Sequence, residues 1–185
     1  RSPARVWALV LLAGTLRLVA PPPSPIPLWT RVLQGARIDR DYFEGLRRGP
    51  AQACYDTLKP FYADLAGLPE ADRRFLFQRV NERVWDEAQR LAALSVQAAT
   101  LRFFLFNMAR IRRGIARLPV PTLVAWGDAD RIMPTANLQP RVDAQPGARG
   151  ALLDGVGHLP QQEHPERLLD RLLPHLQRHA PGPEK

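Results

Sequence analysis

The stretch LPVPTLVAWGDADRIMP, residues 118–134, contains a short apolar run that ends in a polar turn. The run at Val120–Trp126 is shorter than a typical helix and is bounded by proline and glycine, so it is predicted to be a buried β-strand. A second stretch, PGARGALLDGVGHLP at residues 146–160, has the same form, and its strand is predicted at Gly150–Leu153. Each strand is therefore expected to end in a tight turn that contains glycine.

The residues between these strands, Pro134–Ala144, have the composition of a helix with a proline in its first turn. The order strand, helix, strand predicts two parallel strands in one sheet. Asp130 then lies in the turn after the first strand, and His158 lies in the turn after the second. Turns that follow parallel strands lie at one edge of the sheet, where α/β folds place their chemistry. We therefore expect this acid and this histidine to face the same crevice.

Both turns resemble the C-terminal part of an α/β-hydrolase. In that family the acid follows the seventh strand in a G-x-x-D turn, here Gly127–Asp130, and the histidine follows the eighth strand in a G-H-x turn, here Gly157–Leu159. The resemblance is close over residues 118–176 and looser over the first twenty. It implies that the apolar run Val6–Leu12 is the sixth strand, which is buried on both faces.

The run Val6–Leu12 also has a second interpretation. Arg1 and Arg5 before an apolar stretch, with small residues and prolines after it, are typical of a signal peptide. Arg17 interrupts that stretch early, and the stretch is too short to span a bilayer. We favour the strand, and we expect a cytoplasmic protein with no stable membrane span.

The resemblance implies an α/β fold: the C-terminal part of an α/β-hydrolase, with about three parallel strands, flanking helices and an inserted all-helical cap. The core strand is expected in residues 1–20 and the cap, entered through a proline-rich linker, in residues 21–115. The core segment with the acid and the histidine is expected in residues 116–180, followed by a disordered tail at 181–185.

Residues 30–114 have helical periodicity and no strand signal, which is the basis for the predicted cap. A helix over Ala51–Leu65 is expected to kink at Pro60, and Asp86 is expected to cap a further helix. Three phenylalanines are expected in the core of the cap in preference to a substrate pocket: Phe103, Phe104 and Phe106. No motif singles out a substrate-binding residue among the other aromatic side chains of this region, which are Trp29, Tyr42, Tyr55, Tyr62 and Trp85.

The predicted catalytic residues are His158 and Asp130. An imidazole at His158 fits the general base, and a carboxylate at Asp130 fits the acid that fixes its tautomer and stabilises its positive form. The alternatives are a simple turn aspartate and a surface-loop histidine. Asp128 shares the turn, but the family pattern favours Asp130, and Gly157 is expected to let the backbone turn. The remaining histidines, in or beside the last helix, are expected to be solvated: His164, His175 and His179.

The nucleophile of the family lies on a G-x-S-x-G elbow before the sixth strand, and this sequence has no such motif. None of Ser2, Ser24 and Ser95 has the flanking glycines, and Cys54 is expected to be a small buried residue. The resemblance therefore implies a fragment, inactive alone, of a hydrolase that cleaves a small-molecule ester or a related bond. One alternative is an epoxide hydrolase or haloalkane dehalogenase type with an aspartate nucleophile. The other is a non-catalytic helical protein with a signal-like N-terminus.

The amino-acid composition limits the kinds of binding partner that are expected. The 185 residues carry a net charge of +8, nearly all of the positive charge is arginine, and these residues are scattered along the predicted helices. We therefore expect a small-molecule substrate and no nucleic acid. A single cysteine excludes an intramolecular disulfide and a cysteine metal cluster, and neither a cofactor nor a metal is expected. The sequence does not determine the oligomeric state.

Overall fold

The computed structural model of the chain describes residues 6–14 and 28–180. The chain divides into two compact units. The first contains residues 1–23, 60–63 and 109–185, and the second contains residues 24–59 and 64–108. The predicted proline-rich linker and C-terminal tail lie outside the described residues, and the predicted domain limits stay a prediction.

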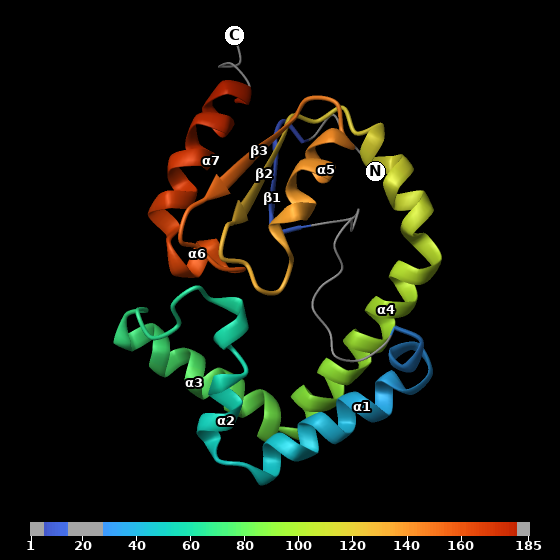
Figure 1. The fold of residues 1–185 in the computed structure, drawn as a ribbon, viewed down its shortest axis with the longest axis vertical. Helices are drawn as coiled ribbons and strands as arrows, with labels where there is room; N and C mark the ends of the chain where they lie inside the picture. The colour runs from blue at the N-terminus through green and yellow to red at the C-terminus, as the bar shows by residue number, and fades with distance from the viewer. Residues whose placement is uncertain (1–5, 15–27, 181–185) are drawn as a thin grey trace. The chain divides into compact units, whose positions relative to one another are not determined.

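The first unit is built on a sheet of three parallel strands in the order β1–β2–β3 (Figure 1). These strands are β1 at Leu9–Leu12, β2 at Thr122–Gly127 and β3 at Ala148–Leu153. The predicted strands and their parallel arrangement are confirmed, but the expected burial of β1 on both faces is wrong, because its four residues are only half-buried. The bounds differ slightly, since β1 begins at Leu9 and not at Val6, and β3 begins at Ala148 and not at Gly150.

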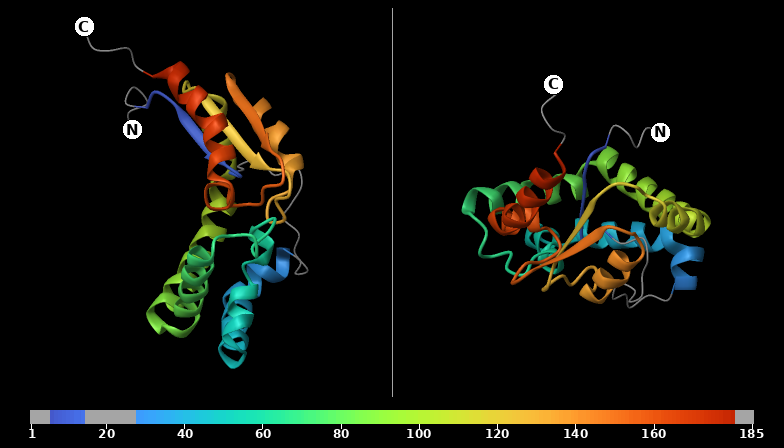
Figure 2. Two further views of the ribbon diagram at one scale, coloured as in Figure 1. Left: turned by 90° about the vertical axis from the view of Figure 1, so that its left-hand side faces the viewer. Right: turned by 90° about the horizontal axis from the view of Figure 1, so that it is seen from above.

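Helices cover both faces of this sheet (Figure 2). One face is covered by α5 at Leu138–Asp143, which follows a 3₁₀ turn at Thr135–Asn137, and the other by α7 at Pro165–His179. Val124 and Trp126 of β2 pack towards α5, whereas Ala125 packs towards Leu168 of α7. Successive strand residues point to opposite faces, so a strand that is buried on both faces has an unbroken apolar sequence. This explains why all six residues of β2 are buried.

A buried polar network anchors the start of β2. The Gln145 side-chain amide donates to the Val120 carbonyl oxygen at 3.0 Å and to Thr122 Oγ1 at 2.7 Å. Its oxygen accepts a hydrogen bond from the guanidinium of Arg141 at 3.0 Å. These contacts tie the segment after α5 to the first residues of β2.

The leucines of α7 are only partly buried. The sequence predicts that five of them pack on the sheet: Leu168, Leu169, Leu172, Leu173 and Leu176. Leu168 does so, whereas Leu169 and Leu173 are exposed, so the prediction is wrong for these two. His175 lies two turns after Leu168 on the same face and is only 5% exposed. The expectation that His175 is solvated is therefore wrong. A short helix, α6 at Pro160–Glu163, precedes α7.

The second unit is helical and has its own core. Its elements are α1 at Leu28–Arg48, α2 at Ala51–Asp56, α3 at Glu70–Trp85 and the part of α4 up to Met108, with α4 itself running over Glu87–Ala116. The buried residues come from three of these helices: Phe43, Cys54, Val80 and Val84. The predicted burial of Cys54 is confirmed, and burial raises the pKa of its thiol.

Several helix limits differ from the sequence prediction. The kinked helix expected over Ala51–Leu65 is wrong, because α2 ends at Asp56 and a 3₁₀ turn, η2, follows at Lys59–Phe61. The predicted cap at Asp86 is confirmed, since its Oδ1 accepts the Gln89 N–H at 2.8 Å. Phe103 and Phe106 are exposed, by 53% and 84%, so the expectation that they lie in the core is wrong for both.

Across residues 6–14 and 28–180, none of the helices combines the length and the apolar character that crossing a bilayer requires.

The burial of His175 predicts how the stability of the first unit depends on pH. Burial, followed by the charge of His179, lowers the pKa of His175 from its ordinary value of 6.5. The backbone of Pro121 and of Leu9 opposes this shift, but no acceptor among the described residues is hydrogen-bonded to the ring nitrogens. Because the unfolded chain binds the proton first, stability is complete above pH 6.5 and falls as the pH drops from there through the lower folded pKa.

We expect His175→Gln to flatten this loss of stability, as measured by urea unfolding between about pH 7 and pH 5. His164→Gln is the control, because His164 pairs with Glu166 at the surface. An equal loss of stability in wild type and His175→Gln would contradict the assignment.

Candidate active site

Asp130 lies in the turn that follows β2, and its carboxylate is held from two sides. Its Oδ1 accepts the backbone N–H groups of Ile132 and Met133, each at 2.8 Å. Its Oδ2 lies 2.8 Å from Nδ1 of His158. The carboxylate has no exposed surface. The two backbone donors thus fix the side chain so that one oxygen faces the imidazole.

His158 lies in the loop after β3. When Nδ1 carries the proton and donates it to Asp130, Nε2 is left as the basic nitrogen on the other side of the ring. The side chain keeps 21% of its surface exposed. The predicted proximity of Asp130 and His158 is therefore confirmed, while their catalytic roles stay a prediction.

Main-chain contacts bring these two turns together. The N–H of Asp128 donates to the Leu153 carbonyl at 3.1 Å, and the N–H of Ala129 donates to the Val156 carbonyl at 3.0 Å. A Cβ atom on Gly127 would lie 2.1 Å from the Val156 oxygen. No side chain fits there, so glycine is required by the close approach of the two turns.

Asp128 lies in the same turn as Asp130 but makes different hydrogen bonds. Its Oδ1 accepts the N–H of Gly155 at 2.7 Å and of Val156 at 3.3 Å. These bonds link the turn after β2 to the loop after β3. The choice of Asp130 over Asp128 as the partner of His158 is confirmed by the contacts.

Gly157 is needed for a reason that the sequence did not indicate. Its φ is not positive, so the expected backbone turn is not what requires glycine. A Cβ atom at this position would lie 2.6 Å from the nitrogen of Ala63 and 2.8 Å from the oxygen of Phe61. Its own N–H donates to Oε2 of Glu163 at 2.6 Å. Glu163 therefore holds the histidine loop from its C-terminal side.

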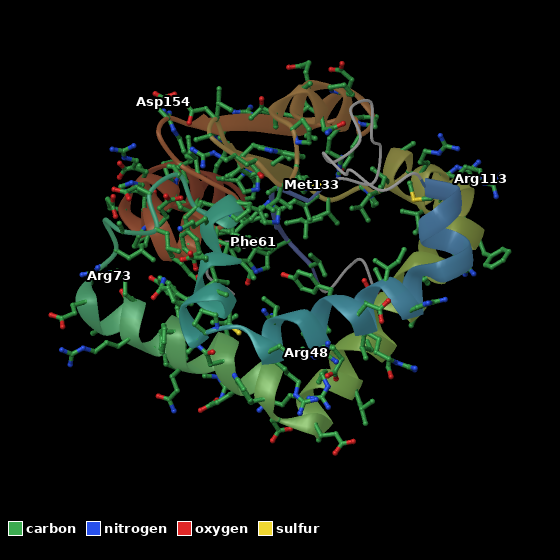
Figure 3. The ribbon with its side chains drawn as sticks, turned by 60° about the horizontal axis from the view of Figure 1, so that its bottom comes forward. Arg48, Phe61, Arg73, Arg113, Met133 and Asp154 are labelled. Atoms are coloured by element: carbon green, nitrogen blue, oxygen red, sulfur yellow. The ribbon has the colours of Figure 1, made fainter. Side chains whose placement is uncertain are left out.

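The sequence did not indicate that Phe61 and Tyr62 contact the segment around His158. The His158 backbone N–H donates to the carbonyl of Phe61 at 2.8 Å, and the two rings lie 5.9 Å apart between centroids. Phe61 is the last residue of the 3₁₀ turn η2 that follows α2 and is labelled in Figure 3. The Tyr62 hydroxyl donates to Oε1 of Gln162. About a hundred residues separate the partners in sequence, so no local motif signals these contacts.

The remaining candidate nucleophiles show no activation. Cys54 is fully buried in the core of the second unit, and Ser95 Oγ donates to the Leu91 carbonyl of its own helix at 2.9 Å. Ser2 and Ser24 lie outside the described residues. Within the described ranges, no group of three His, Cys, Asp or Glu side chains has the arrangement of a metal site.

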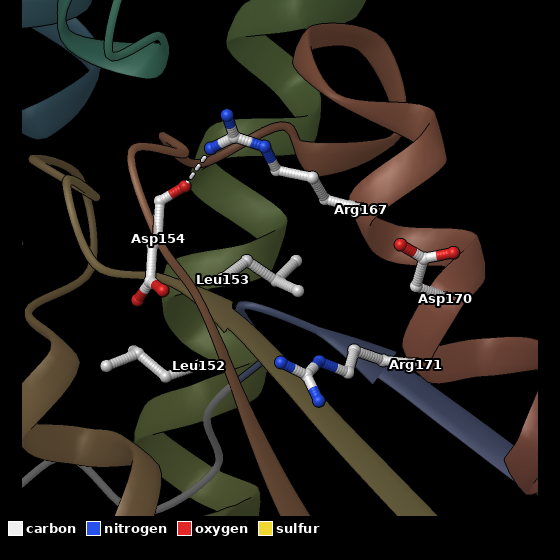
Figure 4. A pocket seen from close by; sticks show the side chains of 6 residues that line it. All are labelled: Leu152, Leu153, Asp154, Arg167, Asp170 and Arg171. Atoms are coloured by element: carbon white, nitrogen blue, oxygen red, sulfur yellow. Dashed lines mark hydrogen bonds between the residues drawn. The ribbon is translucent and has the colours of Figure 1, made fainter.

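A separate hollow lies between β3 and α7 (Figure 4). Its volume is about 510 Å³, and it is lined by two leucines, two aspartates and two arginines: Leu152, Leu153, Asp154, Arg167, Asp170 and Arg171. The guanidinium of Arg167 donates to the backbone carbonyl of Asp154. This lining contains no histidine, serine or cysteine, and the Asp130–His158 pair remains the candidate for chemistry.

Comparisons with known proteins agree with this fold. Residues 3–171 match the Alpha/beta hydrolase family. A pimeloyl-[acyl-carrier protein] methyl ester esterase of Xanthomonas campestris pv. campestris is 26% identical over 182 residues, which cover 92% of this chain and 70% of the relative.

Solved structures show the same fold. A 2-hydroxy-6-oxo-6-phenylhexa-2,4-dienoate hydrolase from Rhodococcus sp. strain RHA1 superimposes with a TM-score of 0.67 at 19% identity over 95% of this chain. An esterase from Thermogutta terrifontis gives a TM-score of 0.56 at 22% identity over 97%. This chain spans only 57% and 59% of the length of those two proteins.

Because the two turns approach each other so closely, one methyl group added at Gly127 is expected to lower the stability of the first unit. We expect Gly127→Ala to destabilise the first unit by about 3 kcal/mol, because the neighbouring atoms are backbone and cannot move aside. Gly114→Ala is the matched control, since Gly114 lies in α4 with nothing within 4 Å of the added atom. It should stabilise the chain by up to about 1 kcal/mol through helix propensity. Urea unfolding measures both, and equal stabilities of the two variants would contradict the contact.

Proposed function

Because the chain belongs to the alpha/beta hydrolase family, we propose that it supplies the acid and the general base of a hydrolase that cleaves a small-molecule ester. His158 is the base, and Asp130 is the acid that orients it. The observation that carries this proposal is that both oxygens of the Asp130 carboxylate are held. Two backbone N–H groups donate to Oδ1, and Oδ2 lies 2.8 Å from His158 Nδ1. A carboxylate held in this way can fix the tautomer of an imidazole.

The proposed reaction follows from this orientation. Nε2 of His158 takes the proton from the attacking nucleophile and later delivers it to the leaving group. While the imidazole is protonated, the carboxylate of Asp130 stabilises its positive charge. The nucleophile is proposed to lie outside these 185 residues, because the sequence has no G-x-S-x-G elbow. The chain alone is then inactive.

An ester is the proposed substrate class because two relatives of this chain are esterases by name, one of them aligned over 92% of the chain. The second candidate is an epoxide hydrolase or dehalogenase type, and an aspartate in place of serine at the elbow would distinguish it. A non-catalytic helical protein does not fit the parallel sheet of the first unit.

The activity test compares the 185-residue chain with the same chain extended by whatever is encoded before Arg1. We expect hydrolysis of p-nitrophenyl esters above the buffer rate only in the extended chain, because nucleophile and oxyanion donors are needed for turnover. Turnover by the 185-residue chain that disappears in His158→Ala would show that the nucleophile lies within it. An extended chain that carries a nucleophile elbow and still hydrolyses no ester would overturn the proposed function.

Two neighbouring aspartates provide a matched pair of variants. In the active chain, Asp130→Asn should lower kcat by at least about 10³-fold, because the amide no longer fixes the required imidazole tautomer. Asp128→Asn keeps an oxygen that accepts the Gly155 N–H, so its kcat should stay within about tenfold of wild type. The reverse order of the two effects would exclude Asp130 as the acid.

A further inference from the structure

The segment Pro60–Ala63 stands out because it belongs to the first unit although it lies between two helices of the second. In sequence it follows α2 and precedes α3. In space its contacts are with the loop that carries His158, more than ninety positions further along the chain. This segment therefore contacts the loop of the proposed base, although its neighbours in sequence belong to the second unit.

The contacts of this segment lie on both sides of His158 along the loop. Before it, the backbone of residues 61–63 approaches Gly157 so closely that an added Cβ would lie within 2.8 Å of three backbone atoms. At His158 itself, the N–H donates to the Phe61 carbonyl at 2.8 Å. After it, the Tyr62 hydroxyl donates to Gln162 in α6, and Tyr62 is only 1% exposed.

Phe61 is the residue of this segment whose side chain meets the imidazole. The ring centroids of Phe61 and His158 are 5.9 Å apart, and the planes are tilted by 59°. Such a separation lies within the range of favourable aromatic contact. The ring of Phe61 is itself half-buried, so it can limit the movement of its neighbour without being a mobile surface group.

Such a contact matters because the hydrogen bond from Nδ1 to Asp130 does not by itself fix the orientation of the imidazole. The bond from Nδ1 to Asp130 fixes one edge of the ring, but the ring can still swing about that edge and about its own side-chain torsions. A small misplacement of a base has a large effect on rate, since proton transfer requires the right distance and direction.

We propose that Phe61 is a positioning residue for His158: its ring holds the imidazole in the orientation in which Nδ1 donates to Asp130 and Nε2 points away. The catalytic meaning of this contact rests on the proposed function, while the contact itself does not. A residue that lies between α2 and α3 in sequence thereby contributes to the orientation of the base.

Nuclear magnetic resonance of the histidine ring nitrogens tests the proposal without turnover. In its neutral form, His158 of wild type should be a single tautomer with the proton on Nδ1 and a slowly exchanging Nδ1–H. Phe61→Ala should give a mixture of tautomers and at least tenfold faster exchange of that proton. Phe61→Tyr keeps the ring and should restore the wild-type pattern.

Phe75→Ala is the matched control, because Phe75 is a phenylalanine of α3 that is 61% exposed. It should leave the His158 signals unchanged. If Phe61→Ala does not fold, Phe61→Leu carries the test, since it keeps most of the volume but not the flat ring. A single tautomer with slow exchange in either folded variant would overturn the proposal, as would a Phe61→Tyr pattern that matches the alanine variant.

A kinetic experiment in the active chain separates this proposal from the proposed function. Phe61→Ala should lower kcat by about 10- to 100-fold in wild type and by less than about threefold in an Asp130→Asn background, because both changes act through the same imidazole. Equal reductions in both backgrounds would show that Phe61 acts independently of His158. If the extended chain hydrolyses no substrate but the tautomer changes with Phe61, the function fails and the positioning role stands.

Discussion

The candidate site depends on a contact between two turns at a point where no side chain fits. Gly127 ends β2 against the carbonyl groups of Val156 and Gly157, and the Val156 oxygen also accepts the N–H of Ala129. Backbone hydrogen bonds therefore join the turn after β2 to the loop after β3 before any catalytic side chain is considered. Because the main chain already holds these segments together, the bond between Asp130 and His158 requires little further ordering.

The register of the sheet determines where along the strands this contact forms. Gly127 is paired with Leu153 in the register of β2 and β3, so both strands end at the same level. Asp130 then follows three residues beyond one strand end, and His158 follows five residues beyond the other. At the start of β2, the amide of Gln145 fixes the strand to the segment after α5. A strand that is packed on both faces and anchored at its start cannot slide without breaking its core contacts.

The sequence predicted those parts of the structure that local pattern determines. The parallel strands β2 and β3 and the turns of Asp130 and His158 follow from apolar runs that end in glycine-containing turns, and the cap of α4 follows from Asp86 alone. The prediction of β1 rested on the resemblance to the α/β-hydrolases. The role of Phe61 and the true reason for Gly157 depend on a segment far away in sequence, so no local pattern contains them. His175 was misplaced for a related reason, since the face of α7 that meets the sheet is decided by packing and not by residue type.

The arrangement also explains which of two neighbouring aspartates meets His158. Asp128 and Asp130 are chemically identical, and the backbone alone distinguishes them: the N–H groups of Gly155 and Val156 bind Asp128, whereas those of Ile132 and Met133 turn one oxygen of Asp130 towards His158. Nothing in this selection involves the substrate or the nucleophile. A fold that orients its base independently of the reacting groups can retain that base while the nucleophile and the substrate pocket change.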